Sequence, residues 1–237
     1  MSVAIPEKHV VRLSFCRIKP IDEKGSIMSM LNLESFCETS LKTEPYEYLV
    51  LPGFIRADCL KQIDADFPKI EQGGSFPLAS LSFGGAFAEL GDELLGENVK
   101  AAFSDKFGLD LSGRPATLTV RGRCRAKDGK VHTDSRSKLI TALIYLNDGW
   151  SGSGGQLPLL RSNDLNDVIT EVPPYAGTLI CFRNRENAWH GHTSYEGPRR
   201  ALQLNWVIDD AAARKSARRH GLSARLKGFT RSLFSRK

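Results

Sequence analysis

Apolar positions divide the chain into an early part with helical spacing and a later part with the alternation of β strands. A short strand is expected at residues 48–51, where a Pro-Gly turn closes it. A helix ending at Pro68 follows, because apolar residues recur there every three to four positions: Leu60, Ile63 and Phe67. A longer helical stretch is expected at about 87–107, with breaks at Gly91 and Gly96.

From about residue 117 the pattern becomes a series of short strands separated by turn residues. The segments expected to form strands are TLTVRGRCR, SKLITALIYLN, QLPLL, VITEV, GTLICF and RRALQLNWV. Strands of this length and spacing predict a sandwich or barrel, with the helices as cover on one side. We therefore expect a mainly β fold with N-terminal helices.

The changes of pattern predict three regions in the chain. They are an N-terminal extension at 1–44, a domain at 45–210 whose catalytic core is 117–208, and a C-terminal tail at 211–237. Met28 and Met30 fall just before the regular pattern begins, so each is an alternative translation start.

The composition is that of an ordinary soluble globular protein, with 41% hydrophobic and 25% charged residues. The five cysteines are scattered and form no Cys-x-x-Cys pair, which argues against a disulfide framework or a structural zinc site. No apolar run approaches the length of a membrane-spanning helix, and the N-terminus lacks the apolar core of a signal peptide. A cytoplasmic location fits these features best.

The net charge of +6 comes from the tail alone. Residues 211–237 contain nine Lys or Arg and no acid, which leaves 24 basic and 27 acidic residues in the body. Nucleic-acid binding is therefore not expected. The pattern of the tail predicts a helix with an apolar stripe, which docks on the body or makes weak contact with an anionic membrane surface. Simple disorder and contact with nucleic acid are the alternatives for this segment. The stripe comprises Leu222, Leu226, Phe229 and Leu233.

The best candidate chemistry lies at His132 and Asp134, which follow a turn and open a strand. Alternate side chains of a strand share a face, so the imidazole and the carboxylate point the same way. They supply two ligands of a 2-His-1-carboxylate triad, which binds Fe(II) and leaves three positions open. The third ligand would come from a distant strand, and either His190 or His192 can provide it.

An arginine follows this histidine pair at a distance that suggests a carboxylate anchor. Arg199 comes nine residues after His190, and Arg200 is its neighbour. An arginine inside a barrel would hold a carboxylate through two parallel hydrogen bonds. If Arg199 points inward, strand alternation also turns Ala201, Gln203 and Asn205 inward. The competing register would instead turn Arg200, Leu202, Leu204 and Trp206 inward, which reads as a core-packed face.

Residues 117–208 resemble the catalytic core of the Fe(II)/2-oxoglutarate dioxygenases, and among them the prolyl 4-hydroxylase-like group. The resemblance rests on an ordered set of motifs rather than on one of them. These are the H-x-D motif, the strand ending Tyr145-Leu146-Asn147, the Gly154-Gly155 loop, QLPLL, the Pro174-x-x-Gly177 turn, LICF, Trp189-His190 and Gly197-Pro198-Arg199.

The resemblance implies a double-stranded β-helix, a jelly roll of the cupin type. It implies an enzyme that couples oxidative decarboxylation of 2-oxoglutarate to hydroxylation of a substrate C–H bond, with release of succinate and CO2. His132, Asp134 and His190 would bind Fe(II), Arg199 the distal carboxylate of 2-oxoglutarate, and Tyr145 the same carboxylate through its hydroxyl. O2 would be the oxidant and ascorbate the reductant.

Several alternatives remain open at this stage. His192 and Arg200 are the second choices for the third ligand and for the anchor. The substrate is unidentified, either a small molecule or a prolyl or other peptidyl group. Arg123 and Trp150 are candidate substrate contacts near the mouth of the barrel. A metal-binding β-helix without turnover is the alternative to an enzyme, and the oligomeric state is not indicated.

Overall fold

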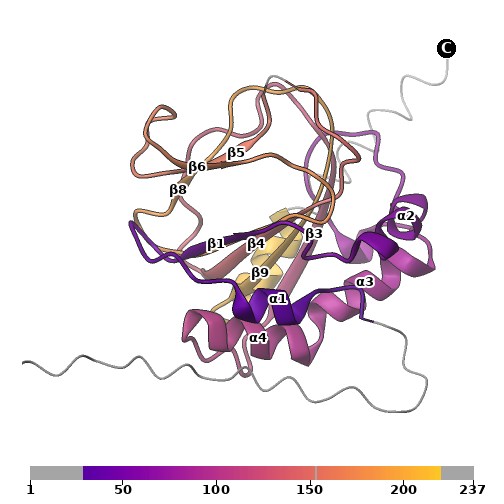
Figure 1. The fold of residues 1–237 in the computed structure, drawn as a ribbon, viewed down its shortest axis with the longest axis horizontal. Helices are drawn as coiled ribbons and strands as arrows, with labels where there is room; N and C mark the ends of the chain where they lie inside the picture. The colour runs from indigo at the N-terminus through magenta and orange to yellow at the C-terminus, as the bar shows by residue number, and fades with distance from the viewer. Residues whose placement is uncertain (1–28, 153, 220–237) are drawn as a thin grey trace, which may run out of the picture.

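The computed structural model describes residues 29–152 and 154–219, which form two antiparallel β sheets, the four helices α1 to α4 and a further helical segment at 210–219. The larger sheet has the strand order β1 (Tyr48–Leu51), β7 (Leu179–Arg183), β4 (Lys138–Tyr145), β9 (Gly197–Val207), β3 (Ala116–Cys124) and β2 (Phe76–Pro77). The smaller sheet has the order β6 (Val168–Val172), β5 (Leu157–Leu160) and β8 (Trp189–His190). The smaller sheet lies over one face of the larger sheet (Figure 1). The predicted mainly β architecture is therefore confirmed.

The helices cover the other face of the larger sheet (Figure 1). They are α1 (Leu33–Glu38), α2 (Ala57–Ala65), α3 (Gly85–Leu95) and α4 (Glu97–Phe107), with a short 3-10 helix at Leu78–Ser80. The break expected at Gly96 is confirmed, because this residue ends α3 and caps α4 in an extended conformation. The break expected at Gly91 is wrong: Gly91 lies buried inside α3, where a β-carbon would stand 3.0 Å from the Leu78 side chain.

The two faces of the larger sheet carry different residues because cross-strand partners share a face. On the helix side, Leu202 pairs with Val120 and Ile144, and Trp206 packs against the helices. On the opposite side, Ala201 pairs with Tyr145 in a second cluster between the sheets. The register that turns Arg199, Ala201, Gln203 and Asn205 away from the helices is thus the one observed.

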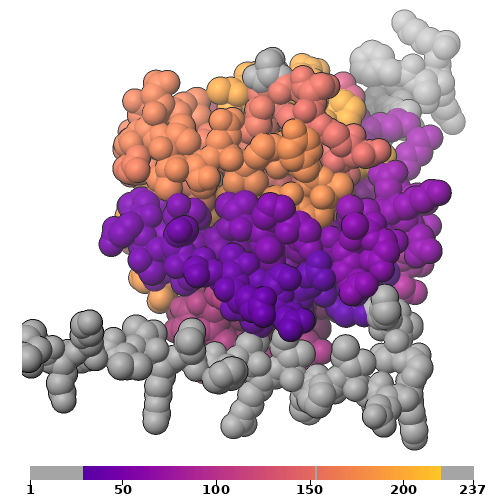
Figure 2. All heavy atoms as spheres, in the orientation of Figure 1, coloured from indigo at the N-terminus to yellow at the C-terminus, as the bar shows by residue number. Residues whose placement is uncertain are grey.

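Part of the expected N-terminal extension is packed into the body. Met30, Leu31 and Phe36 are buried in the cluster between the sheet and the helices. Figure 2 shows this indigo segment lying across the front of the molecule. Near the other end, residues 210–219 are helical. Met28 and the apolar stripe of the tail lie outside the described residues.

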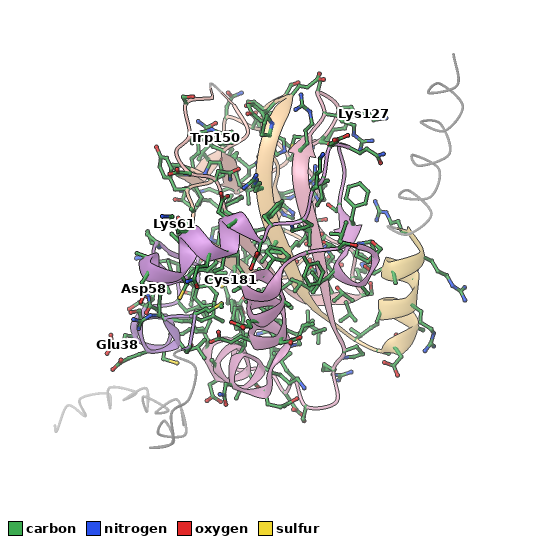
Figure 3. All side chains as sticks on the ribbon, turned by 90° about the vertical axis from the view of Figure 1, so that its right-hand side faces the viewer. Glu38, Asp58, Lys61, Lys127, Trp150 and Cys181 are labelled. Carbon is green, nitrogen blue, oxygen red and sulfur yellow. The ribbon has the colours of Figure 1, made fainter. Side chains whose placement is uncertain are left out.

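No helix within 29–152 or 154–219 has the length and apolar character needed to cross a membrane. Cys124 and Cys181 are fully buried. Cys181 lies among the side chains between the sheet and the helices (Figure 3).

Candidate metal centre

Two side chains of one short segment meet a third from a distant strand between the two sheets. His132, Asp134 and His190 each offer a ligand atom, and these atoms all lie within 4.8 Å of one another. The backbone fixes two of them, because His132 and His190 form an antiparallel bridge with N–H···O distances of 2.9 and 3.0 Å. Their ring centroids are 4.4 Å apart. The backbone bridge therefore fixes the distance between the two histidines, whatever the conformations of their side chains.

Backbone carbonyls orient both imidazole rings. Nδ1 of His132 is 2.8 Å from the Lys130 carbonyl, and Nδ1 of His190 is 3.0 Å from the Ala188 carbonyl. A proton on each Nδ1 donates to the carbonyl and leaves the Nε2 lone pair free, as a metal ligand requires. Burial lowers the pKa of His190 to about 4, so this ring is neutral near pH 7.

Hydrogen bonds hold both oxygens of Asp134. The Thr141 hydroxyl donates to Oδ2 at 2.6 Å, and the Lys138 ammonium donates to Oδ1 at 2.7 Å. Burial opposes ionisation of Asp134, but the charge of Lys138 and these two hydrogen bonds outweigh it and lower its pKa. Two imidazoles and one carboxylate are the donor set that suits a divalent iron ion.

A buried arginine lies on the same side of the larger sheet. Arg199 is 4% exposed, and its Nε donates to the Gly155 carbonyl at 2.7 Å. Its Nη2 donates to the Tyr145 hydroxyl at 3.1 Å, and its guanidinium lies 5.1 Å from the Tyr145 ring centroid. Burial raises the pKa of Tyr145, which keeps the hydroxyl protonated. Within the described part of the chain, no carboxylate forms an ion pair with Arg199.

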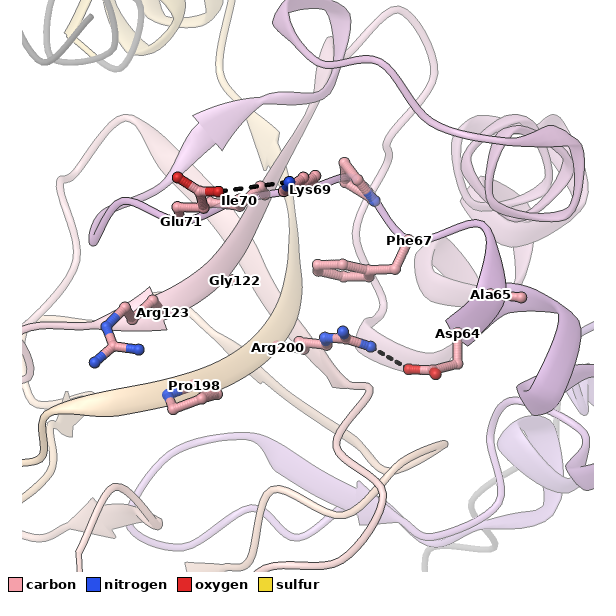
Figure 4. Close-up of a pocket in the computed structure, with 11 residues that line it drawn as sticks. Asp64, Ala65, Phe67, Lys69, Ile70, Glu71, Gly122, Arg123, Pro198 and Arg200 are labelled. Atoms are coloured by element: carbon pink, nitrogen blue, oxygen red, sulfur yellow. Dashed lines mark hydrogen bonds and ion pairs between the residues drawn. The ribbon is translucent and has the colours of Figure 1, made fainter. Parts of the chain in front are cut away.

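Arg200 points to the opposite face of the same strand. Its guanidinium lies 4.7 Å from the Phe67 ring centroid and forms an ion pair with Asp64 of α2. Figure 4 shows both contacts at the edge of a hollow of about 510 Å³ on the outer side of β3 and β9. The geometry thus separates the two candidate arginines, with one between the sheets and one on the outside.

The two expected substrate contacts occupy different places. A β-bulge separates Arg121, which pairs with Ala201 on the interior face, from Arg123, which is exposed and lines the outer hollow (Figure 4). Trp150 packs against Tyr195 at 4.8 Å between ring centroids. It lies on the side of the molecule away from the helices (Figure 3). Roles in substrate binding remain predictions for both residues.

His192 lies outside the three-residue cluster. Its Nδ1 is 2.7 Å from the Thr193 carbonyl, and its ring packs against the backbone of Gly129. A β-carbon at Gly129 would stand 2.1 Å from that ring, and the residue has a φ of +87°. His192 therefore packs against the turn that leads into His132.

Sequence reasoning missed Lys138 and Thr141, the two residues that hold Asp134. Thr141 is in phase with Tyr145 along β4, so strand alternation was a signal that it faces the site. Lys138 had no such signal, because a register shift between Lys138 and Ile140 interrupts the alternation.

An ion-pair cluster orders the turn before His132. Asp128 accepts hydrogen bonds from Arg121 at 3.1 Å and from Arg125 at 2.7 Å, and also from the backbone N–H of Arg125 at 2.9 Å. Burial opposes its ionisation, but the Arg125 hydrogen bonds and the charges of both arginines outweigh it and lower the pKa of Asp128 to about 2.

We expect Asp128→Asn to lower the free energy of unfolding at pH 7 by about 1–2 kcal/mol, since it removes two partly buried ion pairs. A depressed carboxyl pKa gives stability that is present above the unfolded value of 3.8 and is lost as the pH falls toward about 2. Urea unfolding of both proteins at pH 7 and near pH 2.5 measures the difference. A difference that does not shrink in acid would contradict this account.

Residues 123–208 match the family model of the 2OG-Fe(II) oxygenase superfamily. This segment contains all five residues described above as the metal cluster and the buried anchor: His132, Asp134, Tyr145, His190 and Arg199. The predicted resemblance is therefore confirmed at the level of the superfamily. None of the curated proteins matches the sequence.

Solved structures similar to this one include a prolyl-4-hydroxylase of Pseudomonas putida, with 17% identity over 68% of this chain and 91% of that chain and a TM-score of 0.45. The viral collagen prolyl hydroxylase of Paramecium Bursaria Chlorella virus-1 is 17% identical in sequence. The match covers 68% of this chain and 95% of the viral protein, with a TM-score of 0.48. HygX of Streptomyces hygroscopicus, solved with nickel and 2-oxoglutarate, is 16% identical in sequence. The match covers 68% of this chain and 81% of HygX, with a TM-score of 0.46.

Proposed function

We propose that this chain, whose residues 123–208 match the family model of the 2OG-Fe(II) oxygenase superfamily, uses Fe(II), 2-oxoglutarate and O2 to hydroxylate a C–H bond of a small-molecule or peptidyl substrate. The observation that carries the proposal is the buried Arg199 without a carboxylate partner among the described residues, on the same side of the sheet as the His132, Asp134 and His190 cluster. A buried cation without a counter-ion is costly, so the site is built for an anionic ligand.

The protein's own residues would bind and orient the co-substrate. Arg199 would hold the distal carboxylate of 2-oxoglutarate through charge-assisted hydrogen bonds, and the Tyr145 hydroxyl would donate to the same group. Apolar residues between the sheets, among them Leu159, Ile180 and Phe182, would exclude water around the chain of the acid. An iron ion held by the three-residue cluster would supply the oxygen activation that couples loss of CO2 to oxidation of the substrate.

Binding of 2-oxoglutarate to Co(II)-loaded protein, measured by calorimetry, tests this proposal. We expect binding that depends on the metal, and succinate formation when Fe(II), O2 and ascorbate are supplied with proline-containing peptides or a small-molecule extract. Protein that binds the metal but not 2-oxoglutarate would favour the alternative, a metal-binding β-helix without turnover. The unreacted acid and the succinate are both quantified by mass spectrometry.

A further inference from the structure

Lys138 places a cation directly at the candidate metal centre. Its Nζ is 2.7 Å from Oδ1 of Asp134, and the two side chains are only 19% and 8% exposed. Lys138 opens β4 just before the register shift that precedes Ile140. Because Thr141 holds the other oxygen of Asp134, both carboxylate oxygens have a donor.

Each carboxylate oxygen keeps a second lone pair that can coordinate a metal ion, so these hydrogen bonds alone do not prevent metal binding. The ammonium and a divalent ion would nevertheless repel each other across a short distance in a partly buried site, where solvent screens charges weakly. In the absence of metal, however, the ammonium neutralises a buried carboxylate that would otherwise be costly. Lys138 therefore has opposite effects on the two states of the site.

We propose that Lys138 is a resident counter-ion that competes with Fe(II) for Asp134. It keeps the site folded in the absence of metal and weakens metal binding. Because binding is weaker, the fraction of protein that holds iron varies with the free Fe(II) concentration. The inference rests on the proposed function, since it takes the three-residue cluster to be an iron site. If Lys138 served only to orient Asp134 toward the metal, its removal would weaken metal binding instead.

The test is the affinity for Co(II), measured by calorimetry on protein without 2-oxoglutarate. We expect Lys138→Met to tighten Co(II) binding by at least about tenfold, because a repelling charge is removed. The same change should lower the melting temperature of the metal-free protein. Lys138→Arg keeps the charge and should not tighten binding. Lys138→Gln, which removes the charge but keeps a donor, provides a second neutral variant if the methionine variant folds poorly.

Lys100→Met is the matched control. Lys100 has a similarly covered side chain, 22% exposed, and pairs with Glu97 at 2.6 Å on α4, away from the cluster. Its loss should leave Co(II) affinity unchanged. Unchanged or weaker Co(II) binding by the Lys138→Met and Lys138→Gln variants would overturn the inference while leaving the proposed function intact. A wild-type protein that binds no Co(II) would overturn both.

Discussion

Replacing His190 by alanine is expected to lower the affinity for Co(II) by more than about 100-fold, since even loss of a residue that only supports a ligand costs about 10- to 100-fold. Iron-dependent succinate formation should fall to background. The reason is that His190 is buried and belongs to the three-residue cluster, and that its Nδ1 is engaged by the Ala188 carbonyl, which leaves Nε2 for the metal. Calorimetry with Co(II) and a succinate assay check both parts of the result.

His192→Ala is the matched control, because His192 is also buried and lies two residues away. It should keep Co(II) binding and turnover. Its ring packs on Gly129, so the variant should be less stable than wild type. The assays are therefore run well below the melting temperature of the variant. The opposite outcome, with binding lost in His192→Ala and kept in His190→Ala, would reverse the assignment of the third ligand.

Arg199→Met is expected to weaken binding of 2-oxoglutarate by at least about 100-fold while leaving Co(II) affinity unchanged. Two charge-assisted hydrogen bonds to a carboxylate contribute roughly 1.5–3 kcal/mol each, so their loss exceeds this factor. Titration of 2-oxoglutarate into Co(II)-loaded protein measures the effect. Because metal binding is measured separately, a general loss of folding would be recognised.

Arg200→Met tests the same residue type one position along β9. Arg200 packs on Phe67 and pairs with Asp64 on the outer face, so its loss should cost less than about 1 kcal/mol of stability. Binding of 2-oxoglutarate should stay within about twofold of wild type, since this side chain would make no hydrogen bond to the acid. An Arg200→Met variant that loses 2-oxoglutarate while Arg199→Met retains it would contradict the proposed anchor.

Strand alternation was sufficient to predict much of this geometry. His132 and Asp134 are two residues apart and their ligand atoms converge, although only His132 forms a β-bridge and the strand expected to open here begins later, at Lys138. The apolar residues that alternate with Arg199, such as Leu202 and Trp206, pack against the helices and leave Arg199 on the other face. The meeting of Asp134 with His190 came from the family resemblance, since it depends on non-local strand pairing.

Register shifts account for what the pattern could not predict. The bulge in β3 sends Arg121 and Arg123 to opposite faces, although simple alternation puts them on one face. The shift in β4 has the same effect on Lys138. Burial of Met30 and Phe36 was also missed, because Met30 precedes α1 and the apolar residues of this short helix show no clear period.

The backbone bridge between His132 and His190 also governs how a bound metal would leave. Each residue donates its N–H to the carbonyl of the other, so opening the bridge parts His190 from the segment that carries both His132 and Asp134. Release of the ion would then be coupled to a local opening of the backbone. The residence time of the ion would follow the opening rate of this bridge more closely than the strength of any single coordinate bond.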